Sequence, residues 1–147
     1  MCIRDRANRV VFSEQGRAYA FPAANFLDVN LPVTGLGVKN NNCLIFTETT
    51  VHRVESTRAG PVSEFEFENE TGLTAPRSLQ STTVGVFYAS LDGIYLADGL
   101  KSIKISDHLS EFYQRIPRRE NIYSVYDPLN YRVYFYYPDK DLSLIHI

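Results

Sequence analysis

The chain has 147 residues, of which 44% are hydrophobic and 22% are charged, and its formal net charge at pH 7 is -2. A weakly acidic chain lacks the basic footprint of a nucleic-acid-binding domain, so sequence-specific DNA or RNA binding is not expected. No apolar run approaches the ~18 residues that a membrane helix needs, and two cysteines cannot provide a metal-type cysteine cluster.

The first and last six residues, MCIRDR and LSLIHI, differ in character from the sequence between them. They can be back-translated as ATGTGTATAAGAGACAG and CTGTCTCTTATACACAT, which are reverse complements and look like the end of a transposon adapter from a DNA sequencing library. We therefore interpret residues 1–6 and 142–147 as adapter-derived artefacts and exclude them from fold reasoning. Residues 7–141 are then expected to be an internal part of a longer protein. Their net charge is -3, because Arg4, Asp5 and Arg6 no longer count.

Residues 9–55 contain the first strand signals. Arg9–Ser13 is predicted as a strand and is followed by a turn at Gly16. The segment NNNCLIFTETTVHRVE, residues 40–55, predicts a hairpin in which TET joins two strands. Cys43 is expected to be a small buried side chain. His52 is interpreted as an ordinary strand histidine, since no partners for metal binding or general base catalysis can be placed beside it.

The next segment, PVSEFEFEN at residues 61–69, alternates aromatic and acidic residues. This pattern predicts a strand with Phe65 and Phe67 on one buried face. On the opposite face, at ~3.4 Å per residue, successive glutamates would lie ~6.8 Å apart. The acidic residues are Glu64, Glu66, Glu68 and Glu70. A solvated strand face is the plain interpretation, and an acidic wall that repels DNA or a site for a hard cation are the alternatives.

Two further hairpins are predicted from residues 84–99 and 121–139. Asp92 and Gly93 are expected to form the first tight turn, with a positive φ at Gly93, and Asp98 and Gly99 to end that hairpin. In the second hairpin, Asp127 and Pro128 begin the turn, and Asn130 is expected to accept the left-handed conformation.

Between these hairpins, residues 105–117 predict one short inserted helix, with Ser106 as N-cap and Pro117 as the stop. His108 would be an exposed residue of its first turn. Arg115, Arg118 and Arg119 are candidates for contacts with a phosphate or a neighbouring subunit, although a helix C-terminus favours cations in any case. Among the tyrosines of residues 131–137, alternation places Tyr134 and Tyr136 on one face, either for core and interface packing or as a stacking platform.

The central aromatic residues of the three hairpins, Phe46, Tyr88 and Tyr134, are 42 and 46 residues apart. Such spacing is typical of the blades of a β-propeller. The sequence thus predicts an all-β chain, residues 7–141 being a fragment of a β-propeller with about three antiparallel hairpin-bearing units. No nucleophile elbow, phosphate loop or zinc pattern occurs, so neither enzymatic activity nor a cofactor or metal is expected.

The segment RVVFSEQGRAYAFPAANFLDV, residues 9–29, resembles a segment of structural proteins of tailed bacteriophages, of the tail-tube, tail-nozzle or head-to-tail connector kind. The matching positions are Val11, Phe12, Ser13, Gly16, Phe21, Pro22, Asn25, Leu27, Asp28 and Val29. The similarity continues through the hairpins to residue 139, and its motifs are turn and core signatures. The resemblance identifies no catalytic residue in this chain.

The resemblance implies a structural virion component that surrounds a DNA channel and is assembled in the host cytoplasm. The expected partners are other copies in a homo-oligomeric ring, a portal or adaptor protein, and DNA that passes without sequence-specific binding. The alternatives are a propeller-type ligand- or protein-binding module of a bacterial protein and, more distantly, a glycan-acting enzyme with two facing carboxylates.

Overall fold

The computed structural model describes residues 2–14, 16–55, 63–67, 71–138 and 143–146. Within these residues the chain forms four antiparallel sheets and one short α-helix. Within each sheet, strands that are consecutive in the sequence pair with one another, so no crossover connections occur in the described sheets. The prediction of an all-β chain with one inserted helix is confirmed at this level.

The strands follow one another in simple meanders. The first sheet contains β1 (Cys2–Arg6), β2 (Arg9–Phe12) and β3 (Phe26–Asp28). The second contains β4 (Val33–Lys39), β5 (Asn42–Thr47), β6 (Val51–Glu55) and β7 (Ser63–Glu66). The third contains β8 (Gln80–Ser81), β9 (Val86–Ala89), β10 (Ile94–Ala97) and β11 (Ser102–Lys104). The fourth contains β12 (Tyr123–Asp127), β13 (Arg132–Tyr137) and β14 (Ser143–His146).

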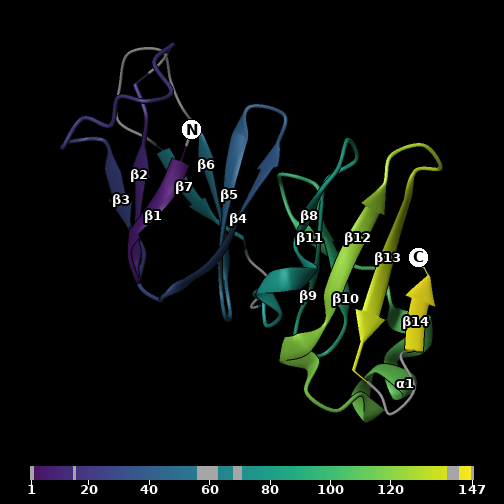
Figure 1. Cartoon of the computed structure of the whole chain (residues 1–147). Helices are drawn as coiled ribbons and strands as arrows, with labels where there is room; N and C mark the ends of the chain where they lie inside the picture. The colour runs from purple at the N-terminus through teal and green to yellow at the C-terminus, as the bar shows by residue number, and fades with distance from the viewer. Residues whose placement is uncertain (1, 15, 56–62, 68–70, 139–142, 147) are drawn as a thin grey trace.

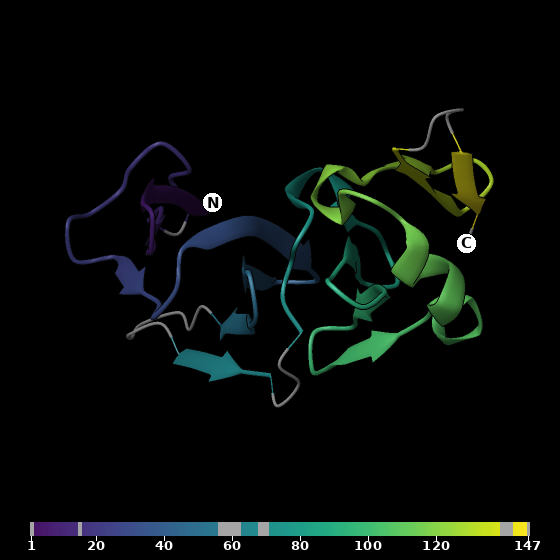
Figure 2. The ribbon, with the colours of Figure 1, turned by 90° about the horizontal axis from the view of Figure 1, so that it is seen from below.

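The helical segments are few and short. They are η1 (Pro76–Ser78), η2 (Asp107–Leu109), α1 (Ser110–Arg115) and η3 (Arg119–Asn121). In Figure 1 the four sheets succeed one another across the molecule in chain order, and α1 lies below β13 and β14. Figure 2 shows the same succession from below.

A separate apolar core fills the space between each pair of successive sheets. Val10 of the first sheet packs with Ile45 and Val54 of the second. Phe46 of the second packs with Tyr88 of the third, their ring centroids 5.0 Å apart. Ile94 of the third sheet and Phe135 of the fourth pack with Tyr113 of α1. The two inner sheets therefore bury side chains on both faces.

Burial on both faces explains why the sequences of the inner strands are continuous runs of apolar residues. In β5, Leu44 and Phe46 enter one core while Ile45 enters the other. In β9, Val86 and Tyr88 likewise face the opposite way from Ala89. A strand covered on both sides needs apolar side chains at every position, as in other fully buried strands. Each large side chain buried in this way contributes about 1.5–3 kcal/mol of transfer free energy.

The three aromatic residues used to predict a period are not equivalent in the structure. Phe46 and Tyr88 face one another across a single core, whereas Tyr134 pairs with the exposed Val125 on the side of β13 opposite to the buried Phe135. A fourth sheet was also missed by the sequence analysis, which predicted only one strand in residues 9–13. The reason is that β2 and β3 are joined by a long connection without a hairpin signature.

The predicted hairpins at residues 40–55, 84–99 and 121–139 are all present. Gly99 adopts φ +100° and Gly16 adopts φ +76°, in agreement with turns at both positions. The prediction for Gly93 was wrong, because its φ is not positive. A side chain there would be crowded, since a Cβ would lie 2.5 Å from Lys104 Cε and 2.7 Å from Ser106 Oγ.

The turn between β12 and β13 differs in a similar way. Tyr131, and not Asn130, adopts the left-handed conformation, with φ 52°. Asn130 Nδ2 instead donates a hydrogen bond to Asp127 Oδ2 at 2.7 Å. The backbone N–H groups of Leu129 and Asn130 donate to Asp127 Oδ1. Asp127 therefore organises the turn through its side chain, as aspartate does in Asx turns.

The inserted helix begins and ends close to the predicted positions. Ser106 precedes η2, but its side chain makes no cap, and Ser106 Oγ accepts the backbone N–H of Ile94 at 2.9 Å. The predicted capping role was therefore wrong, because this hydroxyl attaches the segment to β10. Ile116 ends α1 in an extended conformation before Pro117, as expected of a residue that precedes proline.

The two terminal hexapeptides contribute edge strands. Cys2–Arg6 pairs with β2, and Ser143–His146 pairs with β13. Each strand lies at the outer edge of its sheet in the order of strands. The segments interpreted as adapter-derived thus take positions in the first and fourth sheets.

Candidate functional site

The fourth sheet presents a face rich in tyrosine. In the register of β12 and β13, Tyr123 lies opposite Tyr136, and Val125 lies opposite Tyr134. Residues opposite one another in an antiparallel pair project from the same side of a sheet. Because Ser124, Val133 and Phe135 are buried on the other side, these four residues occupy the outer side. We call Tyr123, Val125, Tyr134 and Tyr136 the tyrosine face.

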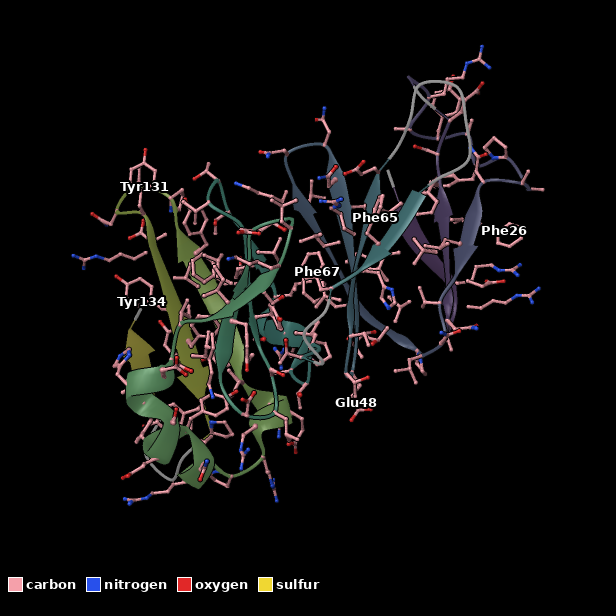
Figure 3. The ribbon with its side chains drawn as sticks, turned by 180° about the vertical axis from the view of Figure 1, so that it is seen from behind. Phe26, Glu48, Phe65, Phe67, Tyr131 and Tyr134 are labelled. Atoms are coloured by element: carbon pink, nitrogen blue, oxygen red, sulfur yellow. The ribbon has the colours of Figure 1, made fainter. Side chains whose placement is uncertain are left out.

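The tyrosine face is partly exposed: Val125 is exposed, and its three tyrosines are half-buried. The rings of Tyr123 and Tyr136 stack with centroids 4.8 Å apart and an interplanar angle of 7°. Val125 is 48% exposed, and among the described residues no core cluster includes a member of this face. Figure 3 shows Tyr134 pointing away from the other sheets. Preformed aromatic surface of this kind is a common component of protein interfaces.

The outer side of the first sheet carries a different set of side chains. Arg9 lies opposite Asp28, and Val11 lies opposite Phe26. We call these four residues the arginine face. Arg9 Nε and Nη2 donate to the two carboxylate oxygens of Asp28, each at 2.6 Å. The Arg9 guanidinium also lies 4.1 Å from the centre of the Phe26 ring. Figure 3 places Phe26 at the end of the molecule opposite Tyr134.

The ion pair fixes the charge state of the arginine face. Hydrogen bonding by Arg9 holds the pKa of the Asp28 carboxyl below its usual value. Asp28 therefore stays ionised through the neutral range, and its carboxylate keeps further lone pairs that can accept hydrogen bonds. A fixed carboxylate beside a guanidinium can receive a hydroxyl donor and an aromatic ring together.

The structure describes only part of the predicted acidic strand. It contains β7, in which Glu64 lies opposite Val54 and Glu66 lies opposite His52, while Glu68 and Glu70 lie outside the described residues. Phe67 is buried as predicted, but Phe65 is 47% exposed. The prediction for Phe65 was wrong because this edge-strand ring packs against Arg53, whose guanidinium lies 4.8 Å from the ring centre.

The three candidate arginines divide into two kinds. Arg115 and Arg118 are exposed, and Arg118 has a positive φ of 52°. Arg119 donates to the carbonyl oxygens of Ile116 at 3.4 Å, Gln114 at 3.2 Å and Leu91. The Arg119 side chain therefore binds the C-terminal end of α1 and the β9–β10 turn within the chain, where cations are favoured by unpaired carbonyl groups.

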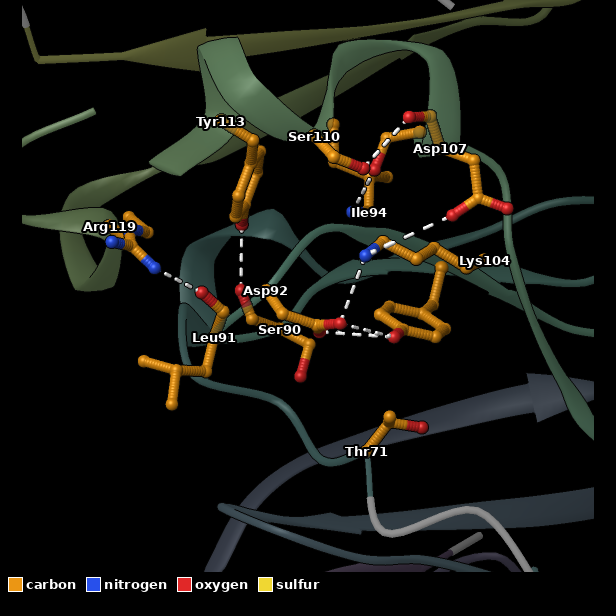
Figure 4. A network of polar contacts seen from close by, with 12 residues as sticks. Thr71, Ser90, Leu91, Asp92, Ile94, Lys104, Asp107, Ser110, Tyr113 and Arg119 are labelled. Atoms are coloured by element: carbon orange, nitrogen blue, oxygen red, sulfur yellow. Dashed lines mark hydrogen bonds and ion pairs between the residues drawn. The ribbon is translucent and has the colours of Figure 1, made fainter. Parts of the chain in front are cut away.

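A polar network joins the same turn to β10, β11 and the helical segment (Figure 4). Asp92 accepts hydrogen bonds from the Tyr95 hydroxyl at 3.0 Å and from Lys104 Nζ at 3.0 Å. Tyr113, on α1, donates to the carbonyl oxygen of Ser90 at 2.7 Å. Burial raises the pKa of both tyrosine hydroxyls, so they remain hydrogen-bond donors. This network holds the helix against the third sheet.

The remaining candidate residues from the sequence are His52, His108 and Cys43. His52 is buried, and its Nε2 lies 2.8 Å from Thr50 Oγ1. His108 is exposed. Cys43 is half-buried and packs against the core that contains Val10 and Ile45, so the burial predicted for it is only partial. In the described part of the chain no group of His, Cys, Asp and Glu is arranged to hold a metal ion. None of its helices has the length and hydropathy needed to cross a membrane.

The structure places on two sheet faces some residues that the sequence had identified as surface candidates and others that it had not. Tyr134 and Tyr136 were predicted to share a face, and they do. Tyr123, Val125, Arg9 and Phe26 were missed as surface candidates. Alternation in residues 123–127 contained a signal for the first two, because buried Ser124 alternates with Tyr123 and Val125. No local signal indicated that Phe26 would lie beneath Arg9.

A scan of protein-family models gives no match to the chain, and a search of curated proteins finds no relative.

Proposed function

We propose that the chain is a sector of a β-propeller in a non-enzymatic structural protein of a tailed bacteriophage, in the tail or the head-to-tail connector. In this role the protein would act in the virion, through subunit contacts around the DNA channel. The observation that carries the proposal is the succession of antiparallel meanders in which each sheet buries a face against the next. The sequence resemblance over residues 9–139 supplies the phage context.

Several features support a propeller as the arrangement of these sheets. The second and third sheets each have four strands in consecutive order, which is the composition of a propeller blade. Radial repetition of such blades explains apolar residues on both faces of inner sheets. It also accounts for the short inter-strand turns at residues 90–93 and 98–101.

The acidic strand is proposed to contribute to the wall of the DNA channel. Carboxylates repel phosphate groups over roughly a Debye length, ~8 Å at physiological salt. Glu64 and Glu66 lie on β7, the last strand of the second sheet in the described chain. A wall of this charge lets DNA pass without binding. In a phage that carries the gene, reversing the charge of these glutamates should impair DNA retention or delivery, and unchanged delivery would contradict the acidic-wall proposal.

The decisive experiment is to amplify outward from the DNA that encodes residues 7–141 and to read the complete gene with its neighbours. A long frame with further hairpin units, adjacent to portal, terminase or capsid genes, is the expected result. A neighbourhood of transporter or sugar-use genes would overturn the virion proposal and favour a bacterial binding module. The number of hairpin units in the same frame tests the propeller separately from the phage context.

A further inference from the structure

Four turns lie together at one end of the second, third and fourth sheets. They join β4 to β5, β8 to β9, β10 to β11 and β12 to β13, at residues 40–41, 82–85, 98–101 and 128–131. Figure 1 shows all four turns at the upper end of the molecule, and we call them the upper turn end. In the proposed propeller, further units of the chain would cover the faces of these sheets and leave their turns exposed.

The upper turn end exposes apolar side chains at positions where turns usually carry polar residues. Two of these tips come from the third sheet and two from the fourth. They are Val84, Leu100, Leu129 and Tyr131, which are 58%, 74%, 88% and 79% exposed. Figure 3 shows Tyr131 at this end and Glu48, of the β5–β6 turn, at the other. Exposed apolar side chains gathered on one surface indicate a binding surface.

Hydrogen bonds between the sheets fix the turns of the third sheet. Lys39, beside the β4–β5 turn, donates from Nζ to the carbonyl oxygen of Thr83. Arg53 Nη1, on β6, donates to the carbonyl oxygen of Gly99 at 3.1 Å. The β8–β9 and β10–β11 turns are therefore both attached to the second sheet. A preformed surface of this kind has less conformational entropy to lose when it binds.

The charged residues of the upper turn end favour an anionic partner. Lys101 and Arg132 are exposed beside the tips, and Lys39 is half-buried. The carboxylates of Asp98 and Asp127 accept backbone N–H groups of their own turns. Both carboxylates are therefore engaged within the turns, while the two exposed cations are available at the surface.

We propose that the upper turn end binds the surface of a lipid bilayer that contains anionic lipids. The apolar tips enter the headgroup region, where aliphatic side chains leave water and a tyrosine ring is favoured. Lys101 and Arg132 contact the anionic headgroups, which attract basic residues over roughly a Debye length. A fluid, planar surface fits this end because it receives separate tips from two sheets at the same time. The inference goes beyond the proposed role in assembly.

The opposite end of the same sheets provides an internal comparison. Leu91, in the β9–β10 turn, is 66% exposed. The charged residues of the β5–β6 and β9–β10 turns are Glu48 and Asp92. Carboxylates at these turns oppose an approach to anionic headgroups. Leu91 is therefore a matched control for the leucines of the upper turn end, with the same side chain on an exposed turn.

Vesicle flotation of the full 147-residue chain tests the contact. The probes are vesicles of phosphatidylcholine alone and vesicles of equimolar phosphatidylcholine and phosphatidylserine. We expect the chain to bind the mixed vesicles more tightly than phosphatidylcholine alone, and to bind them less tightly as salt is added, because salt screens the two cations. A chain that binds neither kind of vesicle, or both equally, would overturn the proposal.

Three variants locate the contact on the molecule. The double variant Leu100→Ser, Leu129→Ser should lower the partition coefficient on mixed vesicles by at least about tenfold. Leu91→Ser should bind as the unmodified chain does. The double variant Lys101→Gln, Arg132→Gln should lose the preference for phosphatidylserine. An equal loss in Leu91→Ser and in the leucine double variant would show that binding does not belong to the upper turn end.

Sedimentation velocity of the leucine double variant separates a lipid contact from self-association. If this variant loses self-association and keeps its vesicle binding, the tips bind a second copy of the chain and the bilayer proposal is wrong. Unchanged sedimentation together with lost vesicle binding supports the proposal. Thermal unfolding at the same midpoint as the unmodified chain shows that the variant is folded. Neither result bears on the gene neighbourhood, which tests the virion role independently.

Discussion

At the scale of single residues, crowding and not backbone conformation disfavours a side chain at Gly93 and at Gly72. A Cβ on Gly93 would meet Lys104 Cε and Ser106 Oγ, which belong to side chains. A Cβ on Gly72 would lie 2.3 Å from both the carbonyl carbon of Glu48 and the backbone nitrogen of Thr49. Side-chain ends can move, whereas the β5–β6 turn must shift as a whole. The sequence offers no signal that separates these two glycines.

We therefore expect Gly72→Ala to destabilise the chain more than Gly93→Ala. Overpacking costs about 1–3 kcal/mol where neighbours can adjust, and this range is expected for Gly93→Ala. Gly72→Ala should reach or exceed the upper limit. Urea denaturation of both variants measures the difference in free energy of unfolding. An equal or smaller loss at Gly72 would show that the β5–β6 turn adapts easily.

The environment of Asp127, in the β12–β13 turn, predicts how the stability of the chain depends on pH. Hydrogen bonds from the Asn130 side chain and from two backbone N–H groups lower the pKa of Asp127 in the folded chain. A depressed carboxyl pKa contributes stability that is present above the unfolded value of about 3.9 and is lost as pH falls through the folded value. Stability should therefore decline below about pH 4. The Asp127→Asn variant should show a smaller decline between pH 5 and pH 2 in denaturation midpoints, and an identical decline would contradict the role assigned to Asp127.

At the scale of elements, hairpins were predictable because turn residues and β-branched runs are local signals. The strands at 42–47, 86–89, 94–97 and 132–137 agree closely with expectation. The function of individual turn residues was less predictable, since Gly93, Ser106 and Asn130 act through contacts with residues that only the fold brings near. The β2–β3 pairing was missed for the same reason, because its connection lacks a local signature.

The C-terminal end of α1 gives a prediction that separates three neighbouring arginines. Arg119 donates to carbonyl groups of α1 and of the β9–β10 turn, while Arg115 and Arg118 are exposed. Hydrogen bonds to charged groups contribute about 1.5–3 kcal/mol, so Arg119→Ala should lower the free energy of unfolding by about 1–3 kcal/mol. Arg115→Ala should change it by less than about 0.5 kcal/mol. Thermal unfolding, monitored by circular dichroism, measures the stability of the two variants.

The same comparison tests the earlier assignment of these arginines to subunit contacts. If Arg115→Ala reduces self-association without changing stability, Arg115 contributes to an interface. If Arg119→Ala is as stable as the unmodified chain, its hydrogen bonds to the carbonyl groups do not hold the helix in solution.

At the scale of the whole molecule, stability is distributed over three cores in the part of the chain that the structure describes. Each core joins two sheets that are adjacent in sequence, so the fold is assembled from contacts between neighbours along the chain. Proteins built in this way gain stability from each added unit and its interface. The continuous apolar runs of β5, β9 and β10 were the sequence signal for this arrangement. The same logic predicts that the outermost sheets, with one face outside a core, are the least protected parts.

The terminal strands make the last prediction. Removing residues 1–6 and 142–147 deletes β1 and β14, which pair with β2 and β13. The exposed backbone N–H and C=O groups of β2 and β13 would then form open edges that recruit strands from other chains. We expect the 7–141 chain to scatter more light and to unfold less cooperatively than the 147-residue chain at equal concentration. A monodisperse monomer with one cooperative unfolding transition would show that β2 and β13 need no partner strand.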